Sequence, residues 1–241
     1  MTKEPAFDMK ICGLSSTAAV SASVASGATM VGLVFFKKSP RNVELEVAAS
    51  LAACARSNHT SQVDIVALTV NPTDDDLERV CNDVAPDVIQ LHGSESPERV
   101  LEIQRRVKTQ VMKAIGVSQS DDFAKLKAYA CVADRLLIDA KPPKDSQLPG
   151  GNGLTFDWNI LDALTADIAG GLPVMLSGGL TTGNVAEAVR LSVAHPVISG
   201  IDVSSGVETS PGVKDKDLIE KFLRLAKAAH SSQKSQKGFA A

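Results

Sequence analysis

The sequence predicts an α/β fold, a single (β/α)8 barrel (TIM barrel) with its active site at the C-terminal face of the strands. Three observations support this prediction. The chain has 241 residues, close to the roughly 250 that one such barrel needs. Short β-branched runs alternate with longer Ala- and Leu-rich stretches from Met9 onward. Glycine- and serine-rich segments follow the last three predicted strands, and loops in this part of a barrel commonly bind phosphate.

Eight short apolar runs are predicted to be strands. Apolar residues make up 44% of the chain and aromatic residues only 4%. The core is therefore expected to consist of Val, Leu, Ile and Ala, which is typical of buried parallel strands. In chain order the predicted strands are Met9–Cys12, Met30–Phe35, Asp64–Thr69, Val88–Leu91, Val111–Ile115, Arg135–Ile138, Pro173–Leu176 and Ile198–Val203.

A stretch with helical character follows each predicted strand. Ser96 before Pro97 is typical of a helix N-cap with proline at the first helical position. Leu218, Phe222 and Leu225 follow the i, i+4, i+7 spacing of one apolar helix face. The predicted helices lie near Ser15–Gly27, Val43–Arg56, Thr73–Val84, Ser96–Val107, Ser120–Cys131, Phe156–Ile168, Thr182–Ser192 and Asp215–His230.

One domain is expected, because no linker interrupts the alternation of strands and helices. The barrel is predicted over residues 9–230, after an N-terminal extension at 1–8. The tail at 231–241 is polar and without periodicity, which predicts disorder. The longest predicted loop, Lys141–Gly153, follows the sixth strand, and a loop of this length is usually functional or mobile. An open doubly wound sheet could hold the same string of elements, so periodicity alone leaves that alternative open.

Charge and composition argue against several classes of function. The chain has 25 Lys and Arg against 28 Asp and Glu, a net charge of −3, so neither nucleic acid nor an anionic membrane is expected as a partner. No apolar run approaches the roughly 18 residues of a membrane span, and the first ten residues lack the apolar segment of a signal peptide. The four cysteines form no C-x-x-C pair and have no companion His at metal-ligand spacing, so neither a metal nor a redox centre is expected. A reducing cytoplasmic location fits best.

Three glycine- or serine-rich segments follow the sixth, seventh and eighth predicted strands. Glycine lets main-chain N–H groups approach an anion closely, although turn geometry alone also explains such segments. Because two of the three follow strands seven and eight, a phosphorylated small-molecule substrate is predicted. The candidate phosphate-binding residues are Gly151, Gly153, Gly178, Gly179, Ser204, Ser205 and Gly206.

Cys12 and Asp139 are the candidate catalytic pair. Cys12 ends the first predicted strand, which places a thiol at the barrel mouth, although a free cysteine is equally often a small buried hydrophobe. Asp139 directly follows the apolar run that ends at Ile138, where a turn or cap is the alternative interpretation. At the same end of a barrel, the two side chains would be a base and an acid.

Four further polar residues are candidates for substrate contacts or chemistry. Arg41, after the second strand, could hold a carboxylate with two hydrogen bonds. His92, after the fourth strand, has no second histidine to form a metal site. Asp202 interrupts a buried strand and is therefore either functional or part of a polar network. Lys113, in the fifth strand, is a rival nucleophile, because a barrel lysine can form a Schiff base.

Six segments of the chain carry motifs that occur together in one enzyme family. They are Lys10-Ile11-Cys12-Gly13; Gly32-Leu33-Val34-Phe35 with Ser39-Pro40-Arg41; Gln90-Leu91-His92-Gly93; Gly150-Gly151-Asn152-Gly153 with Phe156-Asp157-Trp158; Leu176-Ser177-Gly178-Gly179-Leu180 with Asn184-Val185; and Asp202-Val203-Ser204-Ser205-Gly206-Val207-Glu208 with Pro211-Gly212, Lys214 and Asp215. In this order they resemble the phosphoribosylanthranilate isomerase family over nearly the whole chain. Position 152 departs from it, because the family loop often has Thr or Ser there.

The resemblance implies an Amadori rearrangement in L-tryptophan biosynthesis. The substrate would be N-(5-phosphoribosyl)anthranilate and the product 1-(2-carboxyphenylamino)-1-deoxyribulose 5-phosphate. By similarity Asp139 is the general acid that opens the sugar ring, and Cys12 is the general base that removes the C2′ proton. Arg41 would bind the anthranilate carboxylate, with His92 and Asp202 near the sugar. No cofactor is implied, and the family contains both monomers and homodimers.

Three alternative functions remain at this stage. One is another phosphosugar barrel, such as a Schiff-base aldolase that uses Lys113. The second is indole-glycerol-phosphate synthase, against which Cys12 and its context argue. The third is a barrel that binds phosphorylated ligands without catalysis.

Overall fold

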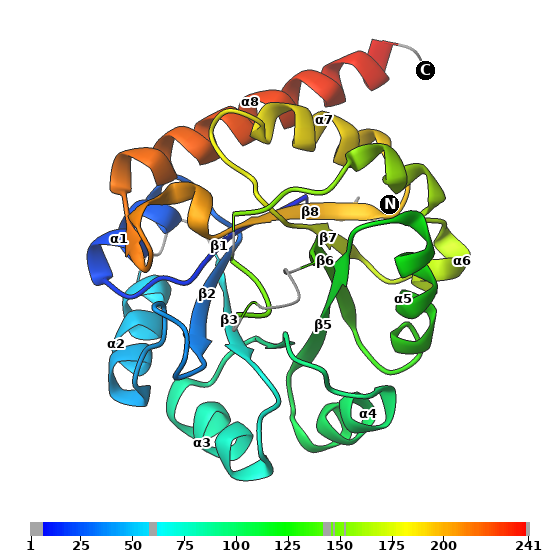
Figure 1. Ribbon diagram of the computed structural model, residues 1–241. Coiled ribbons are helices and arrows are strands. Elements are labelled where there is room, and N and C mark those ends of the chain that lie inside the picture. The colour runs from blue at the N-terminus through cyan, green and yellow to red at the C-terminus, as the bar shows by residue number, and fades with distance from the viewer. Residues whose placement is uncertain (1–6, 58–61, 142–145, 147, 152, 240–241) are drawn as a thin grey trace.

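The computed structural model describes residues 7–57, 62–141, 146, 148–151 and 153–239, with side chains up to residue 233. Eight parallel strands form one closed barrel, in which each strand pairs with the next and β8 pairs with β1. Figure 1 shows this ring of strands with the helices arranged around it. The predicted (β/α)8 barrel is therefore confirmed, and an open sheet is excluded.

The predicted strands agree closely with the observed ones. Four of them have the predicted bounds, because a short run of buried β-branched residues between polar ends specifies a strand. The observed strands are β1 (Asp8–Cys12), β2 (Met30–Phe35), β3 (Asp64–Thr69), β4 (Val88–Leu91), β5 (Gln110–Val117), β6 (Arg135–Ala140), β7 (Val174–Leu176) and β8 (Ile198–Val203).

The helices begin where side chains cap them. The Ser96 hydroxyl accepts a hydrogen bond from the Arg99 N–H at 3.3 Å, with Pro97 at the first helical position. Thr73 and Asp76 form a reciprocal capping box, which satisfies N–H groups that the helix itself cannot. The observed helices are α1 (Thr17–Ala25), α2 (Leu45–Arg56), α3 (Asp74–Val84), α4 (Pro97–Arg106), α5 (Ala124–Tyr129), α6 (Ala166–Ala169), α7 (Val185–Ala194) and α8 (Lys216–Phe239).

The fifth and sixth helices differ from the prediction, because each is divided. The 3₁₀ helix η1 (Ser120–Phe123) precedes α5, and η2 (Trp158–Ala163) precedes α6. The Asp122 carboxylate accepts the Ser118 N–H at 3.0 Å, and Thr165 caps a new helix start. Side chains of this type compete with the helix for backbone groups, so one continuous helix does not form.

The C-terminal region also differs from the prediction. Helix α8 continues to Phe239, although a disordered tail is predicted from residue 231. Adding residues to a helix that already exists is much easier than starting a new one, and Lys and Gln are good helix formers. A hairpin of β9 (Glu208–Ser210) and β10 (Val213–Lys214), which the sequence pattern does not predict, follows β8. Of the expected N-terminal extension, residues 1–6 lie outside the described residues, and Asp8 already belongs to β1.

Alternation along the strands divides the side chains between two faces. Met30, Met112 and Leu137 belong to a cluster inside the barrel, whereas Val111 and Ile115 of β5 belong to the shell between barrel and helices. Because successive strand residues point to opposite faces, the position of a polar residue within its strand decides whether it faces the barrel interior or the helices.

Candidate active site

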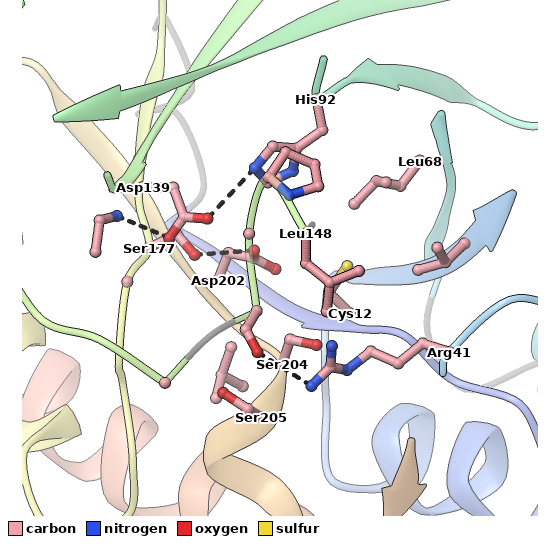
Figure 2. A pocket seen from close by; sticks show the side chains of 18 of the residues that line it. Cys12, Arg41, Leu68, His92, Asp139, Leu148, Ser177, Asp202, Ser204 and Ser205 are labelled. Carbon is pink, nitrogen blue, oxygen red and sulfur yellow. Dashed lines mark hydrogen bonds and ion pairs between the residues drawn. The ribbon is translucent and has the colours of Figure 1, made fainter. Parts of the chain in front are cut away.

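A cavity, partly open to solvent, lies at the carboxyl ends of the strands. Figure 2 shows side chains from several strand ends converging on it. The sequence-predicted residues that line it are Cys12, Arg41, His92, Asp139, Gly151, Gly153, Gly178, Gly179, Asp202, Ser204 and Ser205.

Cys12 ends β1 and lines the cavity with only 3% of its surface exposed. Gly13 follows it with a φ of +77°, a conformation that glycine adopts without strain. This turn lets the N–H groups of Gly13 and Leu14 both donate to the Gly32 carbonyl, at 2.9 and 3.0 Å. Burial raises the pKa of the Cys12 thiol above its ordinary value, and the positive charge of Lys10 opposes that rise.

Asp139 lies near the end of β6 and contacts the imidazole of His92. The Asp139 Oδ2 atom is 3.3 Å from His92 Nε2, and Oδ1 accepts the Ala140 N–H at 2.9 Å. On its other side, His92 Nδ1 is 3.1 Å from the Gln90 amide nitrogen. Figure 2 shows the Asp139 carboxylate facing the His92 imidazole, which is a group that can exchange protons with it.

Asp202 of β8 is buried and paired. Its Oδ1 atom lies 2.9 Å from Lys10 Nζ, and its Oδ2 accepts the Ser177 hydroxyl hydrogen bond at 3.2 Å. Lys10 has none of its surface exposed. The buried carboxylate predicted from the strand pattern is thus satisfied by a buried lysine, as burial of two charges requires.

Arg41 is held by a carboxylate of the β9–β10 hairpin. Glu208 accepts hydrogen bonds from Arg41 Nε at 2.7 Å and Nη2 at 2.9 Å. Lys214 Nζ donates to the same carboxylate at 2.6 Å and to the Ser204 carbonyl at 2.8 Å. Although burial opposes it, the Arg41 and Lys214 partners lower the pKa of Glu208. Two cations thus share one ionised carboxylate, which leaves this cluster with a net positive formal charge.

The glycine-rich loops after β7 and β8 come close to neighbouring backbone. Gly178 has a φ of +93°, and a Cβ there would lie 2.7 Å from the Ala140 nitrogen. A Cβ on Gly206 would collide with the Leu180 carbonyl. Gly206 does not line the cavity, so the structure gives it a role in packing the β8 loop. Of the candidate loop segments, position 152 lies outside the described residues.

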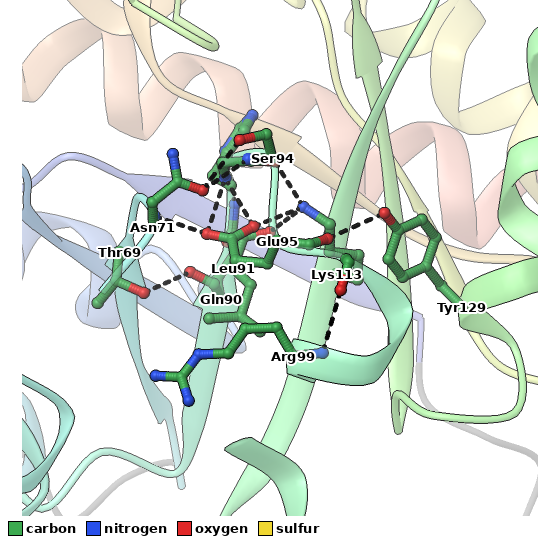
Figure 3. A network of polar contacts seen from close by, with 12 residues as sticks. Thr69, Asn71, Gln90, Leu91, Ser94, Glu95, Arg99, Lys113 and Tyr129 are labelled. Atoms are coloured by element: carbon green, nitrogen blue, oxygen red, sulfur yellow. Dashed lines mark hydrogen bonds and ion pairs between the residues drawn. The ribbon is translucent and has the colours of Figure 1, made fainter. Parts of the chain in front are cut away.

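Lys113, considered above as a rival nucleophile, does not lie where a nucleophile would have to be. It shares the outer face of β5 with Val111 and Ile115 and does not line the cavity. Its Nζ atom lies 2.8 Å from Glu95 and donates to the carbonyls of Leu91 and Gly93. Figure 3 shows this network under the loop that follows β4. A Schiff base at Lys113 would require breaking the network, so the aldolase alternative loses its nucleophile.

The described part of the chain has neither a metal-binding cluster nor a membrane-spanning helix. No group of three or more His, Cys, Asp or Glu side chains there could hold a metal ion. No helix in that part of the chain is long and apolar enough to cross a membrane.

Three charged residues near the cavity have no role in the sequence-based interpretation, namely Lys10, Glu208 and Lys214. Lys10 carries a readable signal, because a lysine in the buried strand that ends at Cys12 breaks the apolar pattern as Asp202 does in its own strand. Glu208 and Lys214 belong to one of the family motifs, but no apolar pattern marks them, because their hairpin is short and polar.

Comparison with known proteins identifies the family. A family model described as N-(5′-phosphoribosyl)anthranilate (PRA) isomerase matches residues 9–224. The chain belongs to the PRA isomerase family. A relative from Rhodopseudomonas palustris (strain BisA53), named N-(5′-phosphoribosyl)anthranilate isomerase, is 51% identical over 222 residues, which are 92% of this chain and 96% of the relative. The resemblance inferred from the motifs is therefore confirmed.

Solved PRA isomerase structures share the barrel. One, described as a complex with reduced 1-(o-carboxyphenylamino)-1-deoxyribulose 5-phosphate, has a TM-score of 0.72 and 31% identity, and the match covers 92% of this chain and 98% of that one. Another, described as monomers generated from the dimeric enzyme of Thermotoga maritima, has a TM-score of 0.71 and 32% identity over the same shares. These matches confirm the predicted TIM barrel and the isomerase class.

Proposed function

We propose that the chain catalyses the Amadori rearrangement of N-(5-phosphoribosyl)anthranilate in L-tryptophan biosynthesis, with Cys12 as general base and Asp139 as general acid. The observation that carries this proposal is that the thiol and the carboxylate, which come from β1 and β6, line one cavity together with glycine-rich loops. Membership of the PRA isomerase family supplies the reaction.

The two anionic ends of the substrate have separate places to bind. The loops after β7 and β8, with Gly178, Gly179 and Ser205, offer N–H and hydroxyl donors for the phosphate. The anthranilate carboxylate would lie against Arg41, whose Nε and Nη2 atoms are held by Glu208. The net positive formal charge of that cluster favours an anion locally, although the chain as a whole carries −3.

Asp139 and Cys12 each carry out one proton transfer of the isomerisation. Asp139 in its acid form donates a proton to the furanose ring oxygen, the C1′–O bond breaks, and the nitrogen lone pair forms a protonated imine. The Cys12 thiolate removes the C2′ proton, and the C–H electron pair gives an enolamine. The enolamine tautomerises to the ketone as C1′ takes up a proton and the C2′ hydroxyl loses one. His92 lies where it can return a proton to Asp139.

The base must be ionised to act. Cys12 must be a thiolate to accept a proton, and burial raises its pKa. At neutral pH the thiolate is then the minor form. Because the protonated imine already acidifies C2′, a small fraction of thiolate suffices.

Point variants test the proposal directly. Cys12→Ser and Asp139→Asn are each expected to lower kcat/KM by about 10²–10⁴-fold and to fail in a tryptophan auxotroph that lacks this isomerase. Cys131→Ser is the matched control, because that thiol is exposed and away from the cavity. Activity that persists in both catalytic variants would remove the assigned roles. Tight binding of the substrate without turnover in the wild type would favour a binding barrel instead.

Two broader features of the enzyme belong to the same proposal. The substrate is a small phosphorylated molecule, bound by a monomer or a homodimer. The four cysteines are free thiols, which fits the reducing environment of the cytoplasm.

A further inference from the structure

Lys10 is a buried cation in the barrel interior whose function the proposed reaction does not explain. It lies two residues before Cys12 in β1, so both side chains point to the same face. Its ammonium group has no exposed surface and lies 2.9 Å from Asp202 Oδ1. A lysine in such a place usually costs stability unless it is paired, so its position beside the thiol calls for an explanation.

The backbone of β2 brings the ammonium group and the sulfur together. Gly32 pairs with Cys12 in the sheet. A Cβ on Gly32 would lie 2.9 Å from Cys12 Sγ and 3.2 Å from Lys10 Nζ, so both atoms surround the space that this glycine leaves empty. The positive charge of Lys10 also acts on Cys12.

Three charged groups from three strands act on the sulfur. Burial is the largest influence and raises the pKa of the Cys12 thiol. The charge of Lys10 on β1 lowers it, that of Asp202 on β8 raises it by less, and that of Lys214 on β10 lowers it least. Among the described residues, the other titratable side chains that line the cavity are Arg41, His92 and Asp139. Although the Lys10–Asp202 pair is formally neutral, its cation has the greater effect on the sulfur.

We propose that Lys10 is a positioning residue for the general base: its buried ammonium ion stabilises the Cys12 thiolate, and Asp202 fixes that ammonium beside the sulfur while partly offsetting its charge. The inference rests on the proposed function, in which Cys12 is the base. The proposal adds to that function an ion pair whose cation is oriented toward the thiol. Burial would otherwise leave the sulfur protonated over a wider pH range.

The test is a titration of the thiol that does not depend on turnover. In a background of Cys54→Ser, Cys81→Ser and Cys131→Ser, Cys12 is the sole cysteine. The rate of its alkylation by iodoacetamide, measured from pH 6 to 11, reports the thiolate fraction. Activity and circular dichroism of this background establish that it is folded.

Two variants should move the midpoint in opposite directions. Lys10→Met/Asp202→Asn removes both charges and leaves none unpaired, so it is expected to fold, and its midpoint should rise by about one pH unit, which is roughly a tenfold loss of thiolate at neutral pH. Asp202→Asn alone keeps the cation and removes the opposing charge, so its midpoint should fall below that of the parent.

A matched control separates this effect from general loss of stability. Lys113→Met/Glu95→Gln removes another buried lysine–carboxylate pair, on the outer face of the barrel, and should leave the midpoint unchanged. A midpoint that stays at the parent value in the Lys10→Met/Asp202→Asn variant would overturn the proposal. A midpoint that moves as expected without any isomerase activity in the parent would instead contradict the proposed function.

Discussion

Two buried lysine–carboxylate pairs lie on opposite faces of the barrel wall, and their surroundings give them different roles. The Lys10–Asp202 pair joins β1 and β8 inside the barrel, beside the thiol. The Lys113–Glu95 pair lies outside the barrel and holds the loop after β4 through hydrogen bonds to Leu91, Gly93 and Asn71. The two pairs are similarly buried and have similar distances between their charged groups. The first acts electrostatically on the thiol, whereas the second holds a loop in place.

The two pairs also differ in how they affect the lysine itself. Burial disfavours the charge of Lys10, but Asp202 raises the Lys10 pKa above its ordinary value. Burial lowers the pKa of Lys113, although Glu95 opposes that change. The Tyr129 ring, 5.6 Å from Lys113 Nζ, and its hydroxyl, which donates to the Glu95 carbonyl at 2.9 Å, complete the clamp. The difference shows that the pKa of a buried lysine depends on both the charge of its partner and the depth of its burial.

The largest effect that would sharpen this comparison is on stability. Lys113→Met leaves the Glu95 carboxylate buried and unpaired, so the free energy of unfolding should fall by about 3–5 kcal/mol, measured by urea denaturation. The Lys113→Met/Glu95→Gln variant should lose clearly less, because no charge is left unpaired. Equal losses in the single and double variants would mean that the carboxylate is not the source of the penalty.

A smaller effect concerns a third carboxylate, Glu208, which lies between two cations at the cavity. Glu208→Gln removes the charge that holds the Arg41 guanidinium, so KM for N-(5-phosphoribosyl)anthranilate should rise roughly tenfold, about 1.4 kcal/mol of binding, with kcat changed little. Steady-state kinetics measure both parameters. Glu44→Gln, at an exposed carboxylate three residues from Arg41, should match the wild type. An unchanged KM in Glu208→Gln would mean that this carboxylate, like that of Glu95, has only a structural role.

The smallest effect is a difference in the pH dependence of stability. Lys10 has a raised pKa when folded, so its contribution is fully present below the unfolded pKa of about 10.4 and is lost as pH rises through the folded pKa. Lys113 has a lowered pKa, so the unfolded chain binds the proton more tightly and stability should increase with pH between the folded pKa and about 10.4.

Unfolding experiments between pH 8 and 11 would measure these two slopes. In a Cys12→Ser background, which removes the thiol titration, the stability of the parent is compared with that of each charge-neutral double variant. Relative to Lys113→Met/Glu95→Gln it should increase with pH. Relative to Lys10→Met/Asp202→Asn it should decrease above about pH 10. If stability changed with pH in the same direction in both comparisons, the inferred difference between the two lysines would be contradicted.

Much of the fold can be predicted from the sequence, because its signals are local. A run such as Ile65–Leu68 is apolar on both faces and bounded by polar residues, which specifies a buried strand. Cap residues such as Ser96 fix where a helix starts. The divided fifth and sixth helices and the extended α8 are not predictable in this way, because side chain–backbone competition and helix propagation decide them.

The site could be predicted as far as its strand ends. Cys12, Asp139 and Asp202 each follow or interrupt an apolar run, and in a parallel barrel the carboxyl ends of the strands meet at one mouth. Their roles as base, acid and sugar contact remain predictions that the proposed variants test. The Arg41–Glu208 pair joins residues far apart in the chain, and no local sequence pattern predicts it.

The sequence by itself determined the barrel, the family and the strand ends from which the active-site residues come, since these depend on short-range patterns and on motifs in a fixed order. Only the tertiary structure decided which carboxylate pairs with each of the two buried lysines. Strand alternation sets the two faces, but closure of the barrel is what brings β8 against β1 and places Asp202 on Lys10. Charge effects depend on distance and burial in three dimensions, so the chemistry of the base is a property of the closed barrel.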